Sequence, residues 1–164
     1  MERAIESRCL SLILRQQPVA SDLRQVSTAL KVVTDLERIG DHASDIAELI
    51  LRIKSEHAYH IVKHLPVMAA SANGMVHDAI EAFIDQDLDA AMEIIERDDE
   101  VDTLFNQVKD DVIHLLQSSP DQADQGIDLL MVAKYLERIG DHAVNVCEWT
   151  QFSKTGALKN VRIM

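Results

Sequence analysis

A heptapeptide, Glu-Arg-Ile-Gly-Asp-His-Ala, occurs twice in this chain and limits the possible folds more than any other feature. The first copy spans residues 37–43 and the second spans residues 137–143. The likeness extends outward, since LKVVTDLERIGDHASDIAE aligns with LMVAKYLERIGDHAVNVCE. Each copy also follows a Leu-rich stretch and a proline, in SLILRQQP and HLLQSSP. A repeat on this scale indicates that a whole structural unit is duplicated.

Apolar residues recur at three- and four-residue intervals through both copies, which is the periodicity of an amphipathic helix. They are Leu36, Ile39, Ala43, Ile46 and Ile50 in the first copy, and Leu129, Val132, Leu136, Ile139 and Ala143 in the second. No segment shows the alternation of a strand, and the three prolines fall between helical patterns. We therefore predict an all-α protein with helices near 2–16, 20–54, 66–85, 87–117 and 121–152.

The repeat also predicts the domain organisation. The first two helices match the last two, and the helix near 66–85 has no counterpart upstream. We interpret the chain as two tandem three-helix bundles, of which the first lacks its N-terminal helix. The incomplete first repeat spans 1–57, the second spans 66–152, and 153–164 forms a C-terminal tail.

The charge balance narrows the function. Asp and Glu number 28 against 16 Lys and Arg, a net charge of -12, which disfavours nucleic acid as a partner. No apolar run is long enough for a membrane span, and the charged start has no signal-peptide core. The two cysteines form no CxxC pair. We expect a cytoplasmic protein.

The sequence has no glycine-rich phosphate loop and no recognisable nucleophile beside a histidine, so we expect no enzymatic activity.

Acidic residues form a stripe along one face of each motif helix. The stripes consist of Glu37, Asp41, Asp45 and Glu48 in the first repeat, and Glu137, Asp141, Asn145 and Glu148 in the second. Like charges at i,i+4 destabilise a helix by about 0.2–0.5 kcal/mol per pair. A multivalent cation with oxygen ligands is the direct way to offset that repulsion, although Arg38 and Arg138 can offset part of it. A solvated acidic face is the plain alternative.

A second acidic pair precedes the second stripe. Asp98 and Asp102 are four residues apart in the sequence ERDDEVD. If the last two helices pack antiparallel, this pair faces Glu137 and Asp141. In the first repeat the matching stretch would lie upstream of residue 1, so that stripe lacks its second wall. Each motif also has a glycine inside its helix, which costs about 0.5–1 kcal/mol relative to alanine. Close approach of a second helix is the simplest reason for it.

These motifs resemble the PhoU family. The resemblance rests on the paired ERIGDHA motifs, on PVASDLRQVSTALKVVTDLERIGDHA, on IERDDEVD and on ERIGDHAVNVCEWTQF. It implies two three-helix bundles related by pseudo-twofold symmetry. It also implies multinuclear iron or zinc clusters on the surface, bound by Glu/Asp-xxx-Asp motifs. These motifs correspond to Glu37 and Asp41, Asp98 and Asp102, and Glu137 and Asp141, and Asp45 and Asn145 hold the position that follows the motif as further ligands.

The resemblance further implies a regulator of phosphate uptake and of the phosphate-starvation response. Such a protein would link the ATPase subunit of a phosphate transporter to a sensor histidine kinase, as a homodimer or higher oligomer. We expect an open apolar groove on the incomplete first bundle, filled by oligomerisation or by a swapped helix. A stand-alone metal-storage protein remains the alternative. A di-iron oxidase is disfavoured because such sites use Glu-xx-His pairs, and no Glu has a His three residues later.

Overall fold

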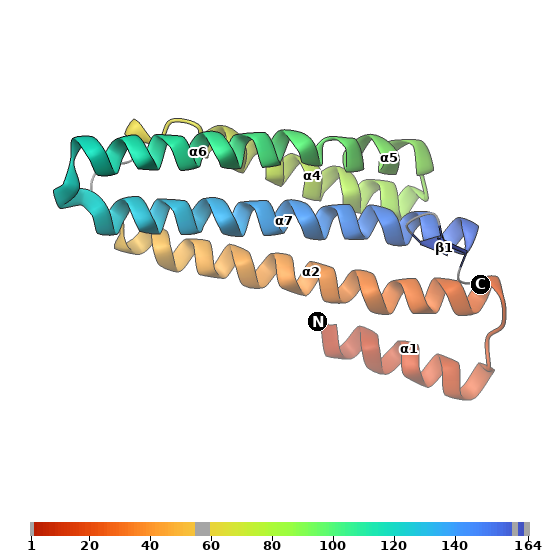
Figure 1. The fold of residues 1–164 in the computed structure, drawn as a ribbon. Helices are drawn as coiled ribbons and strands as arrows, with labels where there is room; N and C mark the ends of the chain where they lie inside the picture. Colours follow the sequence, from red (N-terminus) through yellow and green to blue (C-terminus); the bar gives the residue numbers. More distant parts are fainter. Residues whose placement is uncertain (1, 55–59, 159–160, 163–164) are drawn as a thin grey trace.

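The chain folds into a long helical bundle, seen here in a computed structural model (Figure 1). The structure describes residues 2–54, 60–158 and 161–162. Its helices are α1 (Glu2–Gln16), α2 (Ser21–Arg52), α4 (Leu65–Asp85), α5 (Leu88–Glu96), α6 (Asp98–Ser118) and α7 (Ala123–Thr155), with a 3₁₀ turn, η1 (Pro120–Gln122), before α7. The predicted all-α fold is confirmed.

The observed helices follow the predicted ones to within two residues except at two places. The segment predicted as one helix over 87–117 is two helices, α5 and α6, which are separated by Arg97. Near the C-terminus, α7 continues to Thr155, beyond the predicted end at residue 152. Two very short antiparallel strands follow it, β1 (Ala157–Leu158) and β2 (Val161–Arg162).

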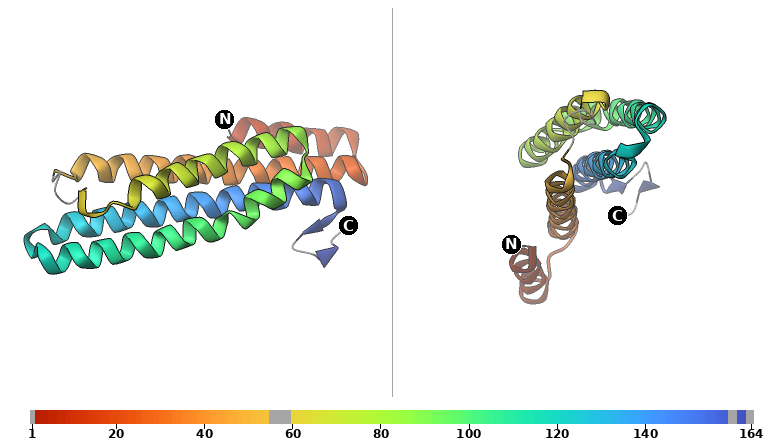
Figure 2. Two further views of the ribbon diagram at one scale, coloured as in Figure 1. Left: turned by 90° about the horizontal axis from the view of Figure 1, so that it is seen from above. Right: turned by 90° about the vertical axis from the view of Figure 1, so that its left-hand side faces the viewer.

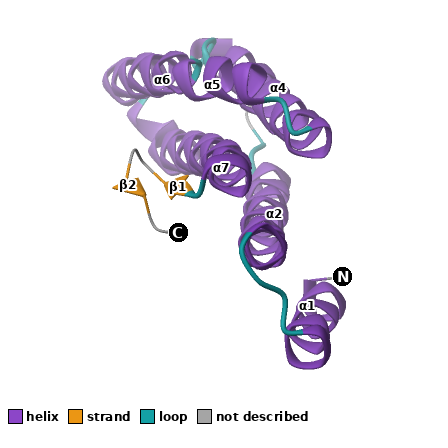
Figure 3. Ribbon diagram, turned by 90° about the vertical axis from the view of Figure 1, so that its right-hand side faces the viewer, coloured by secondary structure: helices purple, strands orange, loops and turns teal. Residues whose placement is uncertain are grey.

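Helix α7 is the centre of the molecule. It packs against α2 on one side and against α4, α5 and α6 on the other, as the end-on view in Figure 3 shows. All five residues of its predicted apolar stripe are buried, namely Leu129, Val132, Leu136, Ile139 and Ala143. They meet fully buried side chains that include Met68 and Met75 of α4, and Val108 and Leu115 of α6. Helices α4–α7 therefore form a complete bundle.

The first unit is thinner than the second. Helix α1 packs on α2, away from the rest of the bundle (Figure 2), and none of its described residues is buried. The apolar stripe of α2 is covered only in part, because Ala43 is exposed and the side chain of Ile50 is 55% exposed. The two repeats thus share a sequence pattern but not the same degree of burial.

Side-chain caps define two of the helix starts. The Oδ1 atom of Asp87 accepts hydrogen bonds from the backbone N–H groups of Asp89 and Ala90, at 3.0 Å each, and so caps α5. Before α4, Asp111 of α6 accepts from both the backbone N–H and the ring Nδ1 of His64. Such contacts satisfy N–H groups that have no partner within the helix. None of the described helices combines the length and the hydropathy of a membrane span.

Candidate cation site and the interface between the repeats

Four carboxylates gather where α6 begins alongside the middle of α7. Asp98 and Asp102 come from α6, and Glu137 and Asp141 come from α7; we call these four residues the acidic cluster. Partial burial, together with the charges of Asp141, Asp102, Asp99 and Glu137, raises the pKa of Asp98 to about 6. The structure therefore brings the two acidic pairs together across the antiparallel helices.

Asp141 responds to the same surroundings. Burial and the neighbouring charge of Glu137 raise its pKa, and Lys134 opposes this shift. The Lys134 ammonium forms an ion pair with Glu137, one turn along α7. Lys134 thus neutralises part of the negative charge of the acidic cluster, while the carboxylates of Asp98 and Asp141 have no such ion pair among the described residues and still repel each other.

Gly140 explains how α6 and α7 come close enough for this. A Cβ atom at Gly140 would lie 3.4 Å from Oδ1 of Asp98 and 3.6 Å from Cγ1 of Val101. The glycine is buried under the first turn of α6. Close helix approach is therefore the role of the glycine in the second motif.

The donor set of the acidic cluster consists of carboxylate oxygens, which suit hard divalent cations and also bind iron and zinc. Partial burial accounts for most of the raised pKa values, and the neighbouring negative charges add to it; a bound cation relieves both effects. Among the described residues, however, no three Asp, Glu, His or Cys side chains are already gathered as ligands of one ion. Side chains of the cluster would have to rotate, and Glu137 would have to leave Lys134.

The first acidic stripe is more exposed than the second. Glu37, Asp41 and Glu48 are exposed, and Asp41 lies 3.6 Å from the guanidinium of Arg38. A Cβ atom at Gly40 would meet nothing within 4 Å in the described part of the chain. Glu37 lines a surface pocket with Glu2 and Arg3 of α1, so among the described elements α1 lies beside this stripe. That the first stripe lacks a facing acidic pair stays a prediction.

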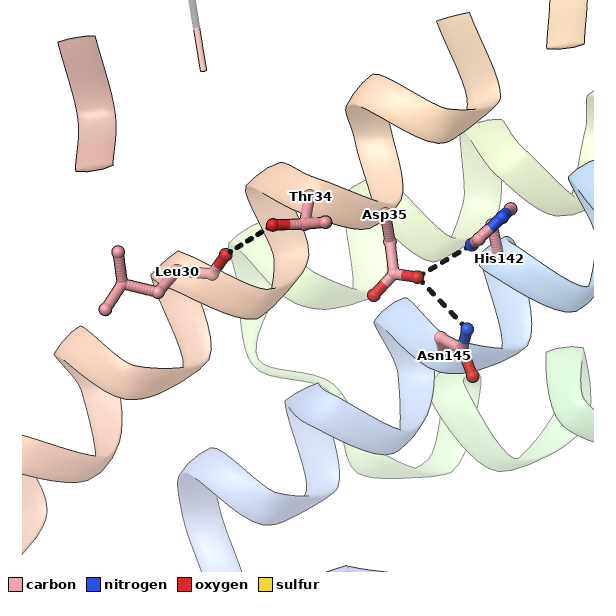
Figure 4. A network of polar contacts seen from close by, with 5 residues as sticks. All are labelled: Leu30, Thr34, Asp35, His142 and Asn145. Carbon is pink, nitrogen blue, oxygen red and sulfur yellow. Dashed lines mark hydrogen bonds and ion pairs between the residues drawn. The ribbon is translucent and has the colours of Figure 1, made fainter. Parts of the chain in front are cut away.

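Asn145 and Asp45 lie apart from the acidic cluster. Nδ2 of Asn145 donates a hydrogen bond to Asp35 of α2, at 3.0 Å, so the amide faces α2 (Figure 4). Asp45 lies 3.8 Å from Nδ1 of His42, which is too far for a hydrogen bond.

Asp35 is a site residue that the sequence reasoning missed. Its Oδ1 accepts hydrogen bonds from Nδ1 of His142 at 2.8 Å and from Asn145 (Figure 4), and the residue is only 9% exposed. Comparison of the repeats contained a signal, because Asp35 and Tyr135 hold the same position, two residues before the motif, and differ completely in chemistry.

The two repeats meet through these equivalent positions. Asp35 contacts His142, and Tyr135 in turn stacks on His42, with ring centroids 5.4 Å apart. The two motif histidines lie between, with centroids 5.7 Å apart. Burial lowers the pKa of His42, and the charges of His142 and Arg138 lower it further. Reciprocal contacts of this kind are what a twofold relation between two units produces.

Comparison with known proteins places this chain among proteins of one family. The family model described as PhoU domain matches residues 1–50 and 65–150. The phosphate-specific transport system accessory protein PhoU homolog of Clostridium acetobutylicum is 42% identical over 157 residues, which are 95% of this chain and 72% of that protein. The PhoU homolog 1 of Thermotoga maritima is 34% identical and is matched over 99% of this chain and 69% of its own length.

Solved structures agree. The crystal structure of PhoU from Pseudomonas aeruginosa superposes with a TM-score of 0.86 at 32% identity, over 95% of this chain and 75% of that one. That of the phosphate transport system regulatory protein PhoU from Streptococcus pneumoniae gives a TM-score of 0.83 at 30% identity, over 96% and 73% of the two chains. On sequence and on structure, this chain belongs to the PhoU family.

Proposed function

We propose that this protein is a cytoplasmic regulator of phosphate uptake and phosphate-starvation signalling whose acidic cluster binds a divalent metal ion or a multinuclear iron or zinc centre. It acts as an adaptor between the ATPase subunit of a phosphate transporter and a sensor histidine kinase. The observation that carries the metal site is the convergence of Asp98 and Asp141. Partial burial is the main cause of their raised pKa values, and neighbouring carboxylates add a repulsion that a cation relieves. The names of its relatives support the link to phosphate transport.

Metal analysis tests the first part of the proposal. The protein is purified without an affinity-tag metal or a chelator, and its iron, zinc and manganese contents are measured. We expect bound metal in the unaltered protein and its loss in Asp98→Asn and Asp141→Asn. Asp110→Asn, an exposed change further along α6, is the control and keeps the metal. A metal content that is the same in all four proteins would contradict the assignment.

Partner capture tests the adaptor role. The transporter ATPase and the sensor kinase are each immobilised, and retention of the protein is measured with and without metal. We expect the unaltered protein to be retained and the metal-free Asp141→Asn variant to be retained less. Retention by neither partner, together with bound metal, would favour a metal-storage protein instead.

Self-association is part of the same proposal. The exposed flank around Gly40, Ala43 and Ile50 supports a homodimer or higher oligomer that covers it. Light scattering coupled to size-exclusion chromatography gives the mass directly. A monomer at every concentration would refute this part.

A further inference from the structure

The interface between the repeats contains a buried carboxylate that neither motif includes. We propose that Asp35 of α2 is a positioning residue for the acidic cluster: it holds His142 and Asn145 against α2 and thereby fixes the face that α7 turns toward α6. This inference rests on the proposed cation binding, because the orientation of Asp141 matters only if the acidic cluster receives a ligand.

The hydrogen bonds to Asp35 have defined directions. A carboxylate accepts, so Nδ1 of His142 and Nδ2 of Asn145 are the donors. Both bonds end on the same oxygen, Oδ1, at 2.8 Å and 3.0 Å. Figure 4 shows the two donors side by side on α7, both directed at Asp35. The carboxylate is almost completely buried and the two donors are partly buried. Loss of the acceptor therefore leaves both donors without their partner where bulk water has limited access.

Helix geometry connects this contact with the acidic cluster. Successive residues of an α-helix are turned by about 100°, so His142 points well away from Asp141. Asn145 lies one turn beyond Asp141 and is displaced by about 40° around the axis. Gly140, on the other side of Asp141, faces Asp98 of α6. The exposed Asp141 therefore lies between the side of α7 held against α2 and the side that meets α6. A rotation of α7 that broke the contacts with Asp35 would also move Asp141.

The equivalent contact, from the second repeat to the motif of the first, has no carboxylate acceptor. Tyr135 holds the position of Asp35 and stacks on His42, and Asp45, the counterpart of Asn145, is not hydrogen-bonded to it in the described structure. The first repeat therefore has an aromatic contact where the second has a pair of directional hydrogen bonds. Asp35 thus orients the stripe of the second repeat, the one that has a facing acidic pair.

Two substitutions at one position separate hydrogen bonding from charge. Asp35→Asn and Asp35→Ala both remove the negative charge, but only asparagine keeps an oxygen acceptor. Mn²⁺ affinity is measured for each by titration calorimetry and by electron paramagnetic resonance. We expect Asp35→Asn to stay within about threefold of the unaltered protein and Asp35→Ala to bind about tenfold more weakly, as is typical when the support of a ligand is lost.

Two controls exclude a general loss of stability. Thr34→Ala removes a neighbouring hydroxyl that bonds only within its own helix, to Leu30, and should leave affinity unchanged. Val32→Ala removes buried volume from α2, and thermal unfolding shows how far it lowers stability. We expect Val32→Ala to bind Mn²⁺ normally at a temperature where both it and Asp35→Ala are folded.

The outcomes distinguish the positioning role of Asp35 from the proposed cation site. If the unaltered protein binds Mn²⁺ and Asp35→Ala binds it equally well, the positioning role is overturned and the proposed cation site stands. If Val32→Ala loses affinity as Asp35→Ala does, the effect follows stability and the positioning role is again overturned. If the unaltered protein binds none of Mn²⁺, Fe²⁺ or Zn²⁺, the proposed metal site and the inference fail together.

Discussion

Oδ1 of Asp98 lies 3.4 Å from the point where a side chain at Gly140 would begin. The smallest residue of the second motif therefore lies directly under one of the carboxylates that the motif faces. In the first motif the same glycine meets nothing within 4 Å among the described residues. The same heptapeptide is thus covered by a neighbouring helix at Gly140 and open at Gly40.

Gly40→Ala should stabilise the protein. The residue lies inside α2 with open space beside it, so alanine brings the helix-propensity gain of about 0.5–1 kcal/mol without a clash. Gly140→Ala should gain less, because its Cβ enters contact with Asp98 and Val101. Urea unfolding of both variants measures the difference. Destabilisation by Gly40→Ala would reveal that another chain covers this flank in solution.

Stability should fall as pH rises through the range in which Asp98 loses its proton. The pKa of this carboxyl is about 6 in the folded protein against 3.8 in the reference state, so the folded state binds the proton more tightly. Its contribution is complete below pH 3.8 and is lost as pH rises through about 6. Asp98→Asn should remove this contribution from the pH profile of the melting temperature, measured with chelator, whereas Asp110→Asn should leave it in place.

Asp87→Ala should cost about 1 kcal/mol. The change removes the oxygen that accepts from the N–H groups of Asp89 and Ala90 at the start of α5, and losses of this kind are typically about 0.5–2 kcal/mol. Asp87→Asn keeps an acceptor and should be close to neutral. Equal losses in the two variants would show that the charge, and not the cap, stabilises α5.

Met75→Ala should be among the most costly single changes. Its side chain is 0% exposed, and truncation of a buried methionine to alanine costs about 2–5 kcal/mol. Met92→Ala is the matched control, because that side chain is 54% exposed and exposed changes stay within about 0.5 kcal/mol. The comparison is made by thermal or denaturant unfolding. Similar losses in both would mean that α4 is not the core helix that the structure describes.

Periodicity predicted the helices well because each of them has an apolar stripe. The predicted helix over 2–16 coincides with α1. The spacing of the two acidic pairs predicts that Asp98 meets Asp141 on the condition that the last two helices pack antiparallel. The interruption at Arg97 was not predictable in this way. No proline or glycine marks it, and its side chain pairs with Asp78 of α4, 19 positions earlier.

Asp35 was missed for a related reason. Local patterns describe which face of one helix is apolar, and a single acidic residue beside that face looks like a surface residue. Its role depends on two donors more than 100 positions later, His142 and Asn145. Only a model of how α2 and α7 cross can supply that pairing.

The reciprocal contact between the repeats has an evolutionary consequence. Position 35 touches the second motif and position 135 touches the first, so each half of the duplicated chain contributes a residue that contacts the motif of the other half. A mutation in one half can therefore change the surroundings of the motif in the opposite half without altering the heptapeptide itself. Identical motifs can in this way acquire unequal properties.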